Sequence, residues 1–320
     1  MHILITGGAG FLGQRLAQQL LQHPIIGKQL QKLTLADVVD APLPADDPRV
    51  SSVKSDLTDP QAAKALITPD VTAVYHLAAV VSGQAEANFD LGMAVNGEGT
   101  RLLLEAVRLG APGSMFVFAS SLAVFGGELP DVITDTTALR PQSSYGTQKA
   151  VAELWVNDYT RKGFIDGRIL RLPTVCVRPG KPNAAASSFA SSIIREPLSG
   201  ETALCPVDTA LPLWLSGPDT VTANLVHSLS LSAYQFSDTR TINLPGITVT
   251  VQEMIEALAA VASKDTTKLI QYQLDENISR IVASWPSRFD VSQAIALGFT
   301  GDRTFTDIVR AHQQTLQTVA

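Results

Sequence analysis

Residues 6–13 read Thr6-Gly7-Gly8-Ala9-Gly10-Phe11-Leu12-Gly13, a glycine-rich stretch between two contrasting segments. Before it, His2–Thr6 is a short apolar run, which is typical of a buried strand. After it, apolar residues recur at helical spacing from Phe11 to Leu21, which predicts a helix. The order of strand, glycine turn and helix indicates the first unit of a doubly wound α/β fold.

The glycines Gly7, Gly10 and Gly13 each have a mechanical task in such a unit. The turn is tight, the backbone approaches a pyrophosphate, and the helix packs closely on the strand. The first helical residues, Phe11 and Leu12, bring free backbone N–H groups and the positive end of the helix dipole toward a phosphate. The stretch therefore predicts a dinucleotide site, with an ordinary tight turn as the alternative.

Short apolar runs and longer amphipathic segments alternate through the first half of the chain. The runs are largely continuous in hydrophobicity, which a parallel sheet covered on both faces requires. The predicted strands are His2–Thr6, Leu33–Asp37, Val50–Lys54, Ala73–His76, Met115–Ser120 and Arg168–Leu172. The predicted covering helices are Phe11–Leu21, Gln61–Ile67, Ala85–Leu109 and Tyr145–Arg161.

Asp37 closes the second predicted strand, 24 residues after Gly13. A carboxylate at this place accepts hydrogen bonds from both hydroxyls of an adenosine ribose and repels a 2′-phosphate. NAD is therefore expected rather than NADP, unless Asp37 is merely a solvated strand end. Asp56, followed by Leu57 after the third strand, is a second candidate, placed to reach the adenine amino group.

Tyr145 and Lys149 stand four residues apart, and Ser121 precedes Tyr145 by 24 residues. On a helix such a pair shares one face, so the ammonium is expected to lower the pKa of the phenol from about 10 and favour the phenolate as a base. Ser121 can hydrogen-bond the substrate oxygen that loses or gains the proton. These three residues predict the catalytic set of a nicotinamide-dependent oxidoreductase, with Ser120 as the alternative to Ser121.

Beyond Arg178 the alternation of strands and helices weakens. The stretch to Leu215 has few strand signals, and Val251–Ala262 and Thr306–Gln317 are typical of peripheral helices. The expected fold is α/β, a doubly wound parallel-sheet Rossmann domain with a smaller α+β substrate lobe. We expect 1–178, with 219–247 returning to it, to form the NAD-binding domain, and 179–218 with 248–320 to form the substrate-binding lobe.

Composition excludes several classes of protein. The net charge of −6 and the pI near 5.4 argue against a nucleic-acid binder, because no basic cluster is present to neutralise phosphates. Cys176, Cys205 and five scattered histidines form neither a disulfide framework nor a metal-ligand pattern, so no metal is expected. No apolar run reaches the ~18 residues that span a bilayer, and no leader precedes the first strand, so a cytoplasmic location away from membranes is expected.

With these motifs the sequence resembles the extended short-chain dehydrogenases/reductases, the superfamily that includes nucleotide-sugar epimerases and dehydratases. The resemblance covers most of the chain and adds several pieces to those above: His76-Leu77-Ala78-Ala79, Asn96, Val124-Phe125-Gly126 and Leu172-Pro173-Thr174-Val175. It implies that Ala78, Ala79 and Asn96 contact the cofactor and that Lys149 also binds the nicotinamide ribose. It further implies that Pro173 and Val175 lie by the nicotinamide, and that Ser121 and Tyr145 face the substrate.

Segments of the second half resemble one group within that superfamily, the D-erythronate dehydrogenases. These segments run from Arg171 to Ser188, from Arg195 to Leu198 and from Ser279 to Asp290. The resemblance implies oxidation of a four-carbon sugar acid at its 2-hydroxyl, which gives the 2-oxo acid and NADH. One position departs from the group, because Leu215 follows Trp214 where the group more often has a His.

A sugar acid needs a cation and hydroxyl donors in its site. Arg178 is best suited to a bidentate contact with the carboxylate, unless it forms a structural ion pair at the junction of the two lobes. The predicted substrate-binding residues are Ser121, Tyr145, Thr174, Arg178, Asn183 and Ser187, with Ser188 beside them.

Two other functions stay open. A nucleotide-sugar epimerase or dehydratase would use the same Ser, Tyr and Lys with a tightly held NAD, but it needs cations for a pyrophosphate. Only Arg178, Lys181 and Arg195 are available between residues 178 and 215. A non-catalytic NAD-sensing protein would be expected to lack the catalytic set.

The predicted helices Ala85–Leu109 and Tyr145–Arg161 carry apolar residues on more than one face. Packing on the sheet buries one face only, so a helix-bundle homodimer is expected.

Overall fold

The computed structural model describes residues 1–22, 25, 29–44, 47–180, 184–236 and 239–319. Within these residues, seven parallel strands form a sheet in the order β10-β6-β5-β4-β1-β2-β3. The strands are β1 (His2–Thr6), β2 (Lys32–Asp37), β3 (Val50–Lys54), β4 (Val71–His76), β5 (Met115–Ser121), β6 (Asp166–Leu172) and β10 (Thr241–Asn243). Thus β10 comes from far along the chain and completes one edge of the sheet.

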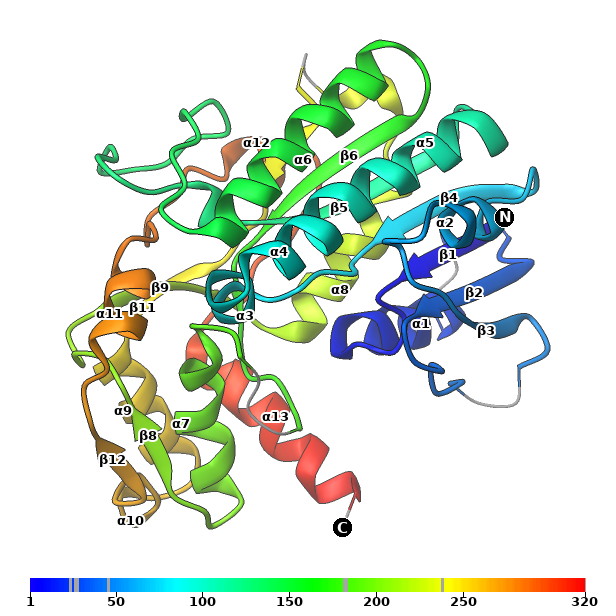
Figure 1. The fold of residues 1–320 in the computed structure, drawn as a ribbon. Coiled ribbons are helices and arrows are strands. Elements are labelled where there is room, and N and C mark those ends of the chain that lie inside the picture. Colours follow the sequence, from blue (N-terminus) through cyan, green and yellow to red (C-terminus); the bar gives the residue numbers. More distant parts are fainter. Residues whose placement is uncertain (23–24, 26–28, 45–46, 181–183, 237–238, 320) are drawn as a thin grey trace.

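Helices cover both faces of this sheet (Figure 1). Successive residues of β1 enter different cores, since Ile3 and Ile5 pack in one cluster and Leu4 packs in another. The first cluster includes residues of α1 (Phe11–Gln22) and α8 (Pro218–Ser228), and the second includes residues of α2 (Pro60–Leu66), α5 (Thr100–Gly110) and α6 (Ser144–Arg161). Burial on both faces explains the continuous hydrophobic runs and confirms the doubly wound fold.

The single helix expected over Ala85–Leu109 is wrong. The chain forms α3 (Ser82–Ala87), α4 (Phe89–Gly92), a π-helical segment η1 (Met93–Gly99) and then α5. Asn88 causes the first break, because its backbone is not helical and its side chain accepts a hydrogen bond from the N–H of Leu91 at 3.0 Å. The π-helical segment contains Asn96, whose side chain is bonded to the backbone of Val80 rather than turned to solvent.

A smaller α+β lobe follows the sheet and lies beside it in Figure 1. One small sheet has the order β11-β9-β7, and another pairs β12 with β8. The strands are β7 (Thr174–Val175), β8 (Ala203–Cys205), β9 (Pro212–Ser216), β11 (Ile247–Thr250) and β12 (Ile270–Tyr272). The helices of this lobe are α7 (Ser188–Leu198), α9 (Val251–Val261), α10 (Lys264–Thr267), α11 (Glu276–Ala283) and α13 (Phe305–Val319). The short helix α12 (Ser292–Ala296) returns to the large sheet, where it contacts β10, and its Ala294 joins the core cluster of α1 and α8.

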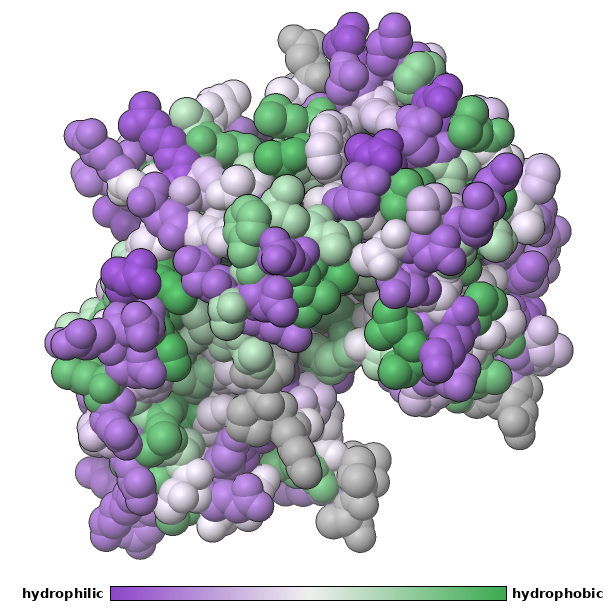
Figure 2. All heavy atoms as spheres, viewed as in Figure 1, coloured by the Kyte–Doolittle hydropathy of each residue, from purple (hydrophilic) through white to green (hydrophobic). Residues whose placement is uncertain are grey.

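These strands are too short to show a period in the sequence, which is why the stretch to Leu215 has few strand signals. Two 3₁₀ turns, η2 (Leu122–Val124) and η3 (Ala233–Gln235), complete the elements found in the described residues. Apolar residues gather where the two parts of the molecule meet, whereas hydrophilic residues cover much of the outer rim (Figure 2). None of the described helices combines the length and the apolarity that crossing a membrane requires.

Candidate active site

A cavity of about 440 Å³ opens at the carboxyl ends of the central strands. The strand order reverses between β1 and β4, and open α/β sheets bind ligands at that place. Most of the residues predicted for the site line this cavity: Gly7, Gly10, Phe11, Leu12, Gly13, Ala79, Ser121, Tyr145, Lys149, Pro173, Thr174, Val175, Arg178 and Ser187.

The glycine loop forms a cradle that side chains would fill. Gly7 has φ 74°, and a Cβ added to it would lie 2.7 Å from the backbone nitrogen of Ala78. A Cβ on Gly13 would lie 2.2 Å from the carbonyl oxygen of Gly7. The loop and the start of α1 therefore leave backbone surface free for a phosphate, and these residues fit the pyrophosphate of NAD.

Asp37 lies against the glycine loop at the end of β2. Its carboxylate accepts hydrogen bonds from the N–H groups of Ala9 at 3.0 Å and Val38 at 2.8 Å. Asp56 accepts bonds from the N–H and hydroxyl of Thr58, at 2.9 and 2.8 Å, and Leu57 is buried in the core. None of Asp37, Asp56 and Leu57 lines the 440 Å³ cavity, and their roles toward an adenosine stay predictions.

Ala78 and Asn96 also lie outside the lining of the cavity. The backbone of Ala78 abuts Gly7, whereas Asn96 is buried behind the loop that follows β4. The amide of Asn96 accepts from the N–H of Val80 at 2.8 Å and donates to its carbonyl at 3.0 Å. The contacts of Asn96 thus hold the loop that carries Ala79 into the cavity, and its direct contact with a cofactor is untested.

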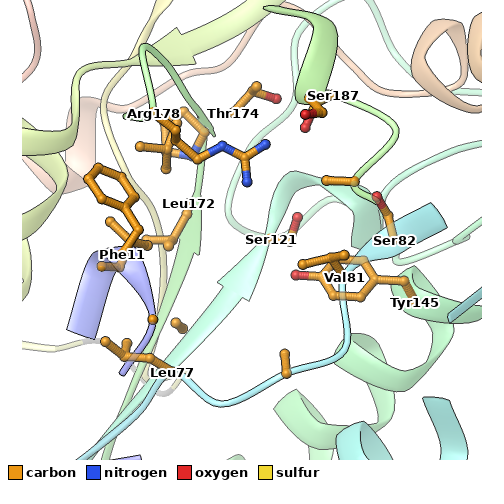
Figure 3. Close-up of a pocket in the computed structure, with 18 of the residues that line it drawn as sticks. Phe11, Leu77, Val81, Ser82, Ser121, Tyr145, Leu172, Thr174, Arg178 and Ser187 are labelled. Carbon is orange, nitrogen blue, oxygen red and sulfur yellow. The ribbon is translucent and has the colours of Figure 1, made fainter. Parts of the chain in front are cut away.

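Tyr145 and Lys149 come from the first turns of α6, and Ser121 comes from the end of β5. The hydroxyl of Ser143 accepts a bond from the N–H of Gly146 at 3.1 Å and caps the helix just ahead of Tyr145. A Cβ on Gly146 would lie 2.1 Å from the carbonyl of Ala123, so glycine lets α6 approach the end of β5. Figure 3 shows the side chains of Ser121 and Tyr145 facing the same space.

The ammonium of Lys149 is buried and donates a hydrogen bond to the backbone of β5. Its Nζ donates to the carbonyl of Ala119 at 2.8 Å and lies 5.8 Å from the centroid of the Tyr145 ring. Burial lowers the pKa of Lys149 to about 8, and the charge of Glu153 acts in the opposite direction.

The expected lowering of the Tyr145 pKa by Lys149 is wrong for this structure. Burial raises the pKa of Tyr145 to about 12, while a hydrogen bond with Ser121 and the charge of Arg178 act in the lowering direction. The desolvation of the phenolate outweighs both effects. The cation that lowers the phenol pKa is Arg178, a residue 33 positions away in the sequence.

Ser120 is engaged behind the cavity. Its hydroxyl donates to Glu153 at 2.5 Å, and Glu153 is also paired with Arg171 at 2.7 Å, with both charged side chains almost wholly buried. Ser121 instead accepts from the nearby N–H of Ala123, at 3.2 Å, and its hydroxyl faces Tyr145, with which it is hydrogen-bonded (Figure 3). This arrangement favours Ser121 over Ser120 as the residue that contacts a substrate.

Arg178 points its guanidinium into the space between Thr174, Ser187 and Ser121 (Figure 3). Its backbone is held in place, since its N–H donates to Ser191 Oγ at 3.0 Å and its carbonyl accepts from Arg195 at 2.6 Å. In the part of the chain that the structure describes, no carboxylate lies within ion-pair distance of the guanidinium. The alternative of a structural ion pair thus finds no support there, and Asn183 lies outside the described residues.

Several lining residues escaped the sequence-based prediction. Val81 and Ser82 follow Ala79 at the carboxyl end of β4, and that position was the available signal. Arg195 and Trp285 come from the second lobe, where no local pattern predicted them as lining residues. Leu215, which stands where a His was expected, is fully buried in the core of that lobe and does not line the cavity.

No cluster of three His, Cys, Asp or Glu side chains is arranged to hold a metal ion among the described residues. The described residues that line the cavity bring together the phenol of Tyr145, the ammonium of Lys149, several hydroxyls and two arginines, Arg178 and Arg195, above a glycine cradle.

Comparison with known proteins agrees with this chemistry. The model of the NAD dependent epimerase/dehydratase family matches residues 3–227. A D-erythronate dehydrogenase of Haemophilus influenzae is 52% identical over 310 residues, covering 97% of this chain and 98% of that protein. A D-erythronate dehydrogenase of Cupriavidus necator is 51% identical over 319 residues, covering 98% of each chain. Among solved structures, a nucleoside-diphosphate-sugar epimerase from Agrobacterium tumefaciens has a TM-score of 0.92 at 40% identity, covering 100% of this chain and 95% of its own.

Proposed function

This chain belongs to the NAD dependent epimerase/dehydratase family, and on that premise we propose that it is an NAD-dependent dehydrogenase that oxidises D-erythronate at the 2-hydroxyl. The two D-erythronate dehydrogenases, each more than half identical over nearly the whole chain, support the reaction class and the substrate. The single observation that carries the proposal is the guanidinium of Arg178 directed at Ser121 and Tyr145 in one cavity. A carboxylate bound there presents its neighbouring hydroxyl to the phenol.

The reaction converts the acid and NAD⁺ to the 2-oxo acid, NADH and a proton. When bound, NAD supplies the acceptor for the hydride that leaves C2. The phenolate oxygen of Tyr145 takes the proton from the 2-hydroxyl of the acid. Ser121 donates a hydrogen bond to the substrate oxygen that loses this proton. Arg178 holds the carboxylate by paired hydrogen bonds, which orients C2.

Lys149 has two tasks in the proposed mechanism. One of its protons is committed to the carbonyl of Ala119, which fixes the ammonium below the ring of Tyr145. Its other N–H groups, for which the described residues show no further acceptor, would bind the nicotinamide ribose, as predicted for the cofactor-binding set. Gly7, Gly10 and Gly13 would hold the pyrophosphate, Asp37 the adenosine ribose, and Pro173 and Val175 the nicotinamide side of the cavity.

A second cavity bears on the alternative of a nucleotide-sugar epimerase. Its volume is about 760 Å³, and it lies beside the first, between α3 and the second lobe. Three carboxylates, of Glu86, Glu196 and Asp275, line it together with the guanidinium of Arg280, the one cation among its described lining residues. This balance of charge disfavours a pyrophosphate and favours the dehydrogenase.

The organisation of the whole protein is part of the proposal. We assign NAD binding to residues 1–178 with 219–247, and substrate binding to 179–218 with 248–320. We also propose a cytoplasmic homodimer. Exposed apolar residues on the outer faces of α5 and α6 support the dimer, notably Leu109, Val151 and Leu154.

The test is formation of NADH by the purified protein from NAD and a panel of C3 to C6 sugar acids, including D-erythronate and L-threonate. UDP-sugars are assayed in parallel for epimerised product. We expect stoichiometric NADH with D-erythronate and unchanged UDP-sugars. Conversion of a UDP-sugar without release of NADH would instead assign Tyr145 and Lys149 to a redox-neutral epimerase.

A further inference from the structure

The two cavities lie on either side of one short segment of the second lobe. Ala185 and Ser188 line both the 440 Å³ cavity and the 760 Å³ cavity. Across from this segment, Ser82 lines the first cavity and its neighbour Gly83 lines the second. Residues 184–188 and the start of α3 thus form a wall between the two spaces.

Direct contacts join the two halves of this wall. The hydroxyl of Ser82 accepts a hydrogen bond from the N–H of Ala186 at 3.1 Å, and both residues are buried. A Cβ added to Gly83 would lie 2.3 Å from the carbonyl oxygen of Ala184, so the segment rests on the bare backbone of α3. No side chain fits at residue 83 unless the wall moves.

The first half of the wall is tied to the helix that carries the catalytic residues. The amide of Asn96 holds both backbone groups of Val80, which lies two residues before Ser82. Asn96 in turn donates to Gln148 at 2.8 Å, and Gln148 precedes Lys149 on α6.

The second half of the wall is anchored by packing. Ser187 and Ser188 begin α7, whose residues Phe189 and Ile193 are buried in the core of the second lobe. The wall is therefore fixed at both ends, and the contact of Ser82 and Gly83 with 184–186 joins them.

We propose that this contact determines the length of acid that the enzyme accepts, with Gly83 as the specificity-determining residue. The inference rests on the proposed function. Figure 3 shows Val81 and Ser82 beside Tyr145, so an acid with its carboxylate at Arg178 and its C2 at Tyr145 would direct the carbons beyond C2 toward the wall. A longer acid would have to extend further toward the wall, where residues 184–186 take up the space between the two cavities.

Gly83→Ala tests the wall with one methyl group. Alanine is a better helix former than glycine, so any loss comes from the collision with Ala184 rather than from α3 itself. Gly97→Ala is the matched control, because its Cβ would meet nothing closer than the Cε of Met93 at 3.9 Å. Ser82→Ala is a milder second variant, which leaves the N–H of Ala186 without its acceptor and loosens the same contact.

The measurement is kcat/KM for D-erythronate, D-ribonate and D-allonate, acids of increasing length with the same configuration at C2 and C3. The wild type is expected to prefer the C4 acid. Gly83→Ala is expected to shift the ratio of C6 to C4 activity by about tenfold or more toward the longer acid, with Ser82→Ala shifting it less and Gly97→Ala leaving it unchanged.

Two failures are distinguishable. If the wild type oxidises none of these acids, the proposed function is wrong and the role of the wall in it falls as well. If the wild type oxidises D-erythronate but both wall variants keep the wild-type ratio, or lose activity equally with all three acids, the wall does not set substrate length. Titration with NAD shows whether each variant is folded, and Ser82→Ala decides the matter should Gly83→Ala fail to fold.

Discussion

Burial and the proposed catalytic role place opposite requirements on the pKa of Tyr145. Burial raises its pKa to about 12, yet the proposed mechanism requires its phenolate to take a proton. Ser121 and Arg178 act in the lowering direction, so the residues proposed to bind the substrate would also favour the base form of Tyr145. Both effects depend on side chains that fold against Tyr145 from elsewhere in the chain.

Replacement of Tyr145 by Phe removes the base and keeps the ring. We expect kcat for the sugar acid to fall by about 10²- to 10⁴-fold, because proton transfer loses its acceptor. The affinity for NAD, measured by fluorescence titration, should stay near the wild-type value. Near wild-type turnover in this variant would remove Tyr145 from the mechanism.

The pH dependence of kcat/KM follows the protonation of Tyr145. In the proposed mechanism the active form is the phenolate, so we expect activity to rise as pH increases through the pKa of Tyr145. Ser121→Ala removes a hydrogen bond that lowers this pKa, so the rising limb is expected to move to higher pH, with lower activity throughout. A pH profile of the variant that coincides with the wild-type limb would show that Ser121 does not act on Tyr145.

Arg178 is assigned to the carboxylate of the substrate. Arg178→Ala should raise KM for the acid by roughly 10- to 100-fold, because a charged hydrogen-bonding partner is worth about 1.5–3 kcal/mol. Arg280→Ala is the matched control, since Arg280 is exposed and lines only the second cavity. Equal KM values for the two variants would mean that the carboxylate binds elsewhere.

At the scale of elements, a buried ion pair joins α6 to the central sheet. Glu153 on α6 pairs with Arg171 on β6 at 2.7 Å and accepts a hydrogen bond from Ser120 on β5. The pair thus holds the helix of Tyr145 and Lys149 against the strand of Ser121. Each partner lies within the protein and depends on the other to compensate its charge.

Removing one partner leaves the other charge buried. Glu153→Ala is expected to lower the free energy of unfolding by about 3–5 kcal/mol, as measured by urea denaturation. The exposed pair of Glu98 with Arg101 offers a control, and Glu98→Ala should cost about 1 kcal/mol or less. Similar losses in the two variants would contradict the structural role of the buried pair.

The elements also show where prediction from sequence succeeds. The central strands and α1, α2 and α6 agree with prediction within a few residues, because each has enough length to show its period. The segment after Ala85 was predicted as one helix, although Asn88 and the π-helical turn divide it. Strands such as β7 and β8 depend on pairing with distant segments, and no local sequence pattern predicts them.

The whole molecule presents an apolar surface along α5 and α6. Leu154 is 64% exposed and Leu109 is 67% exposed, which is costly for a monomer in water. Leu154→Glu is therefore expected to convert the proposed homodimer to a monomer, as measured by light scattering. Leu274→Glu, at an equally exposed site in the second lobe, should leave the mass unchanged. A monomeric wild type would exclude the dimer.

The sequence by itself determined the α/β class, the glycine cradle and the spacing of Tyr145 and Lys149. Each is a short-range feature, in which the period of a strand or helix decides which residues lie together. Only the tertiary structure decided that Arg178 lies opposite Tyr145, that Leu215 is buried, and that a wall from two lobes bounds the cavity. It also showed that the pKa of Tyr145 is raised and not lowered. Desolvation of the phenol depends on every residue packed around it, and a local sequence pattern does not identify those residues.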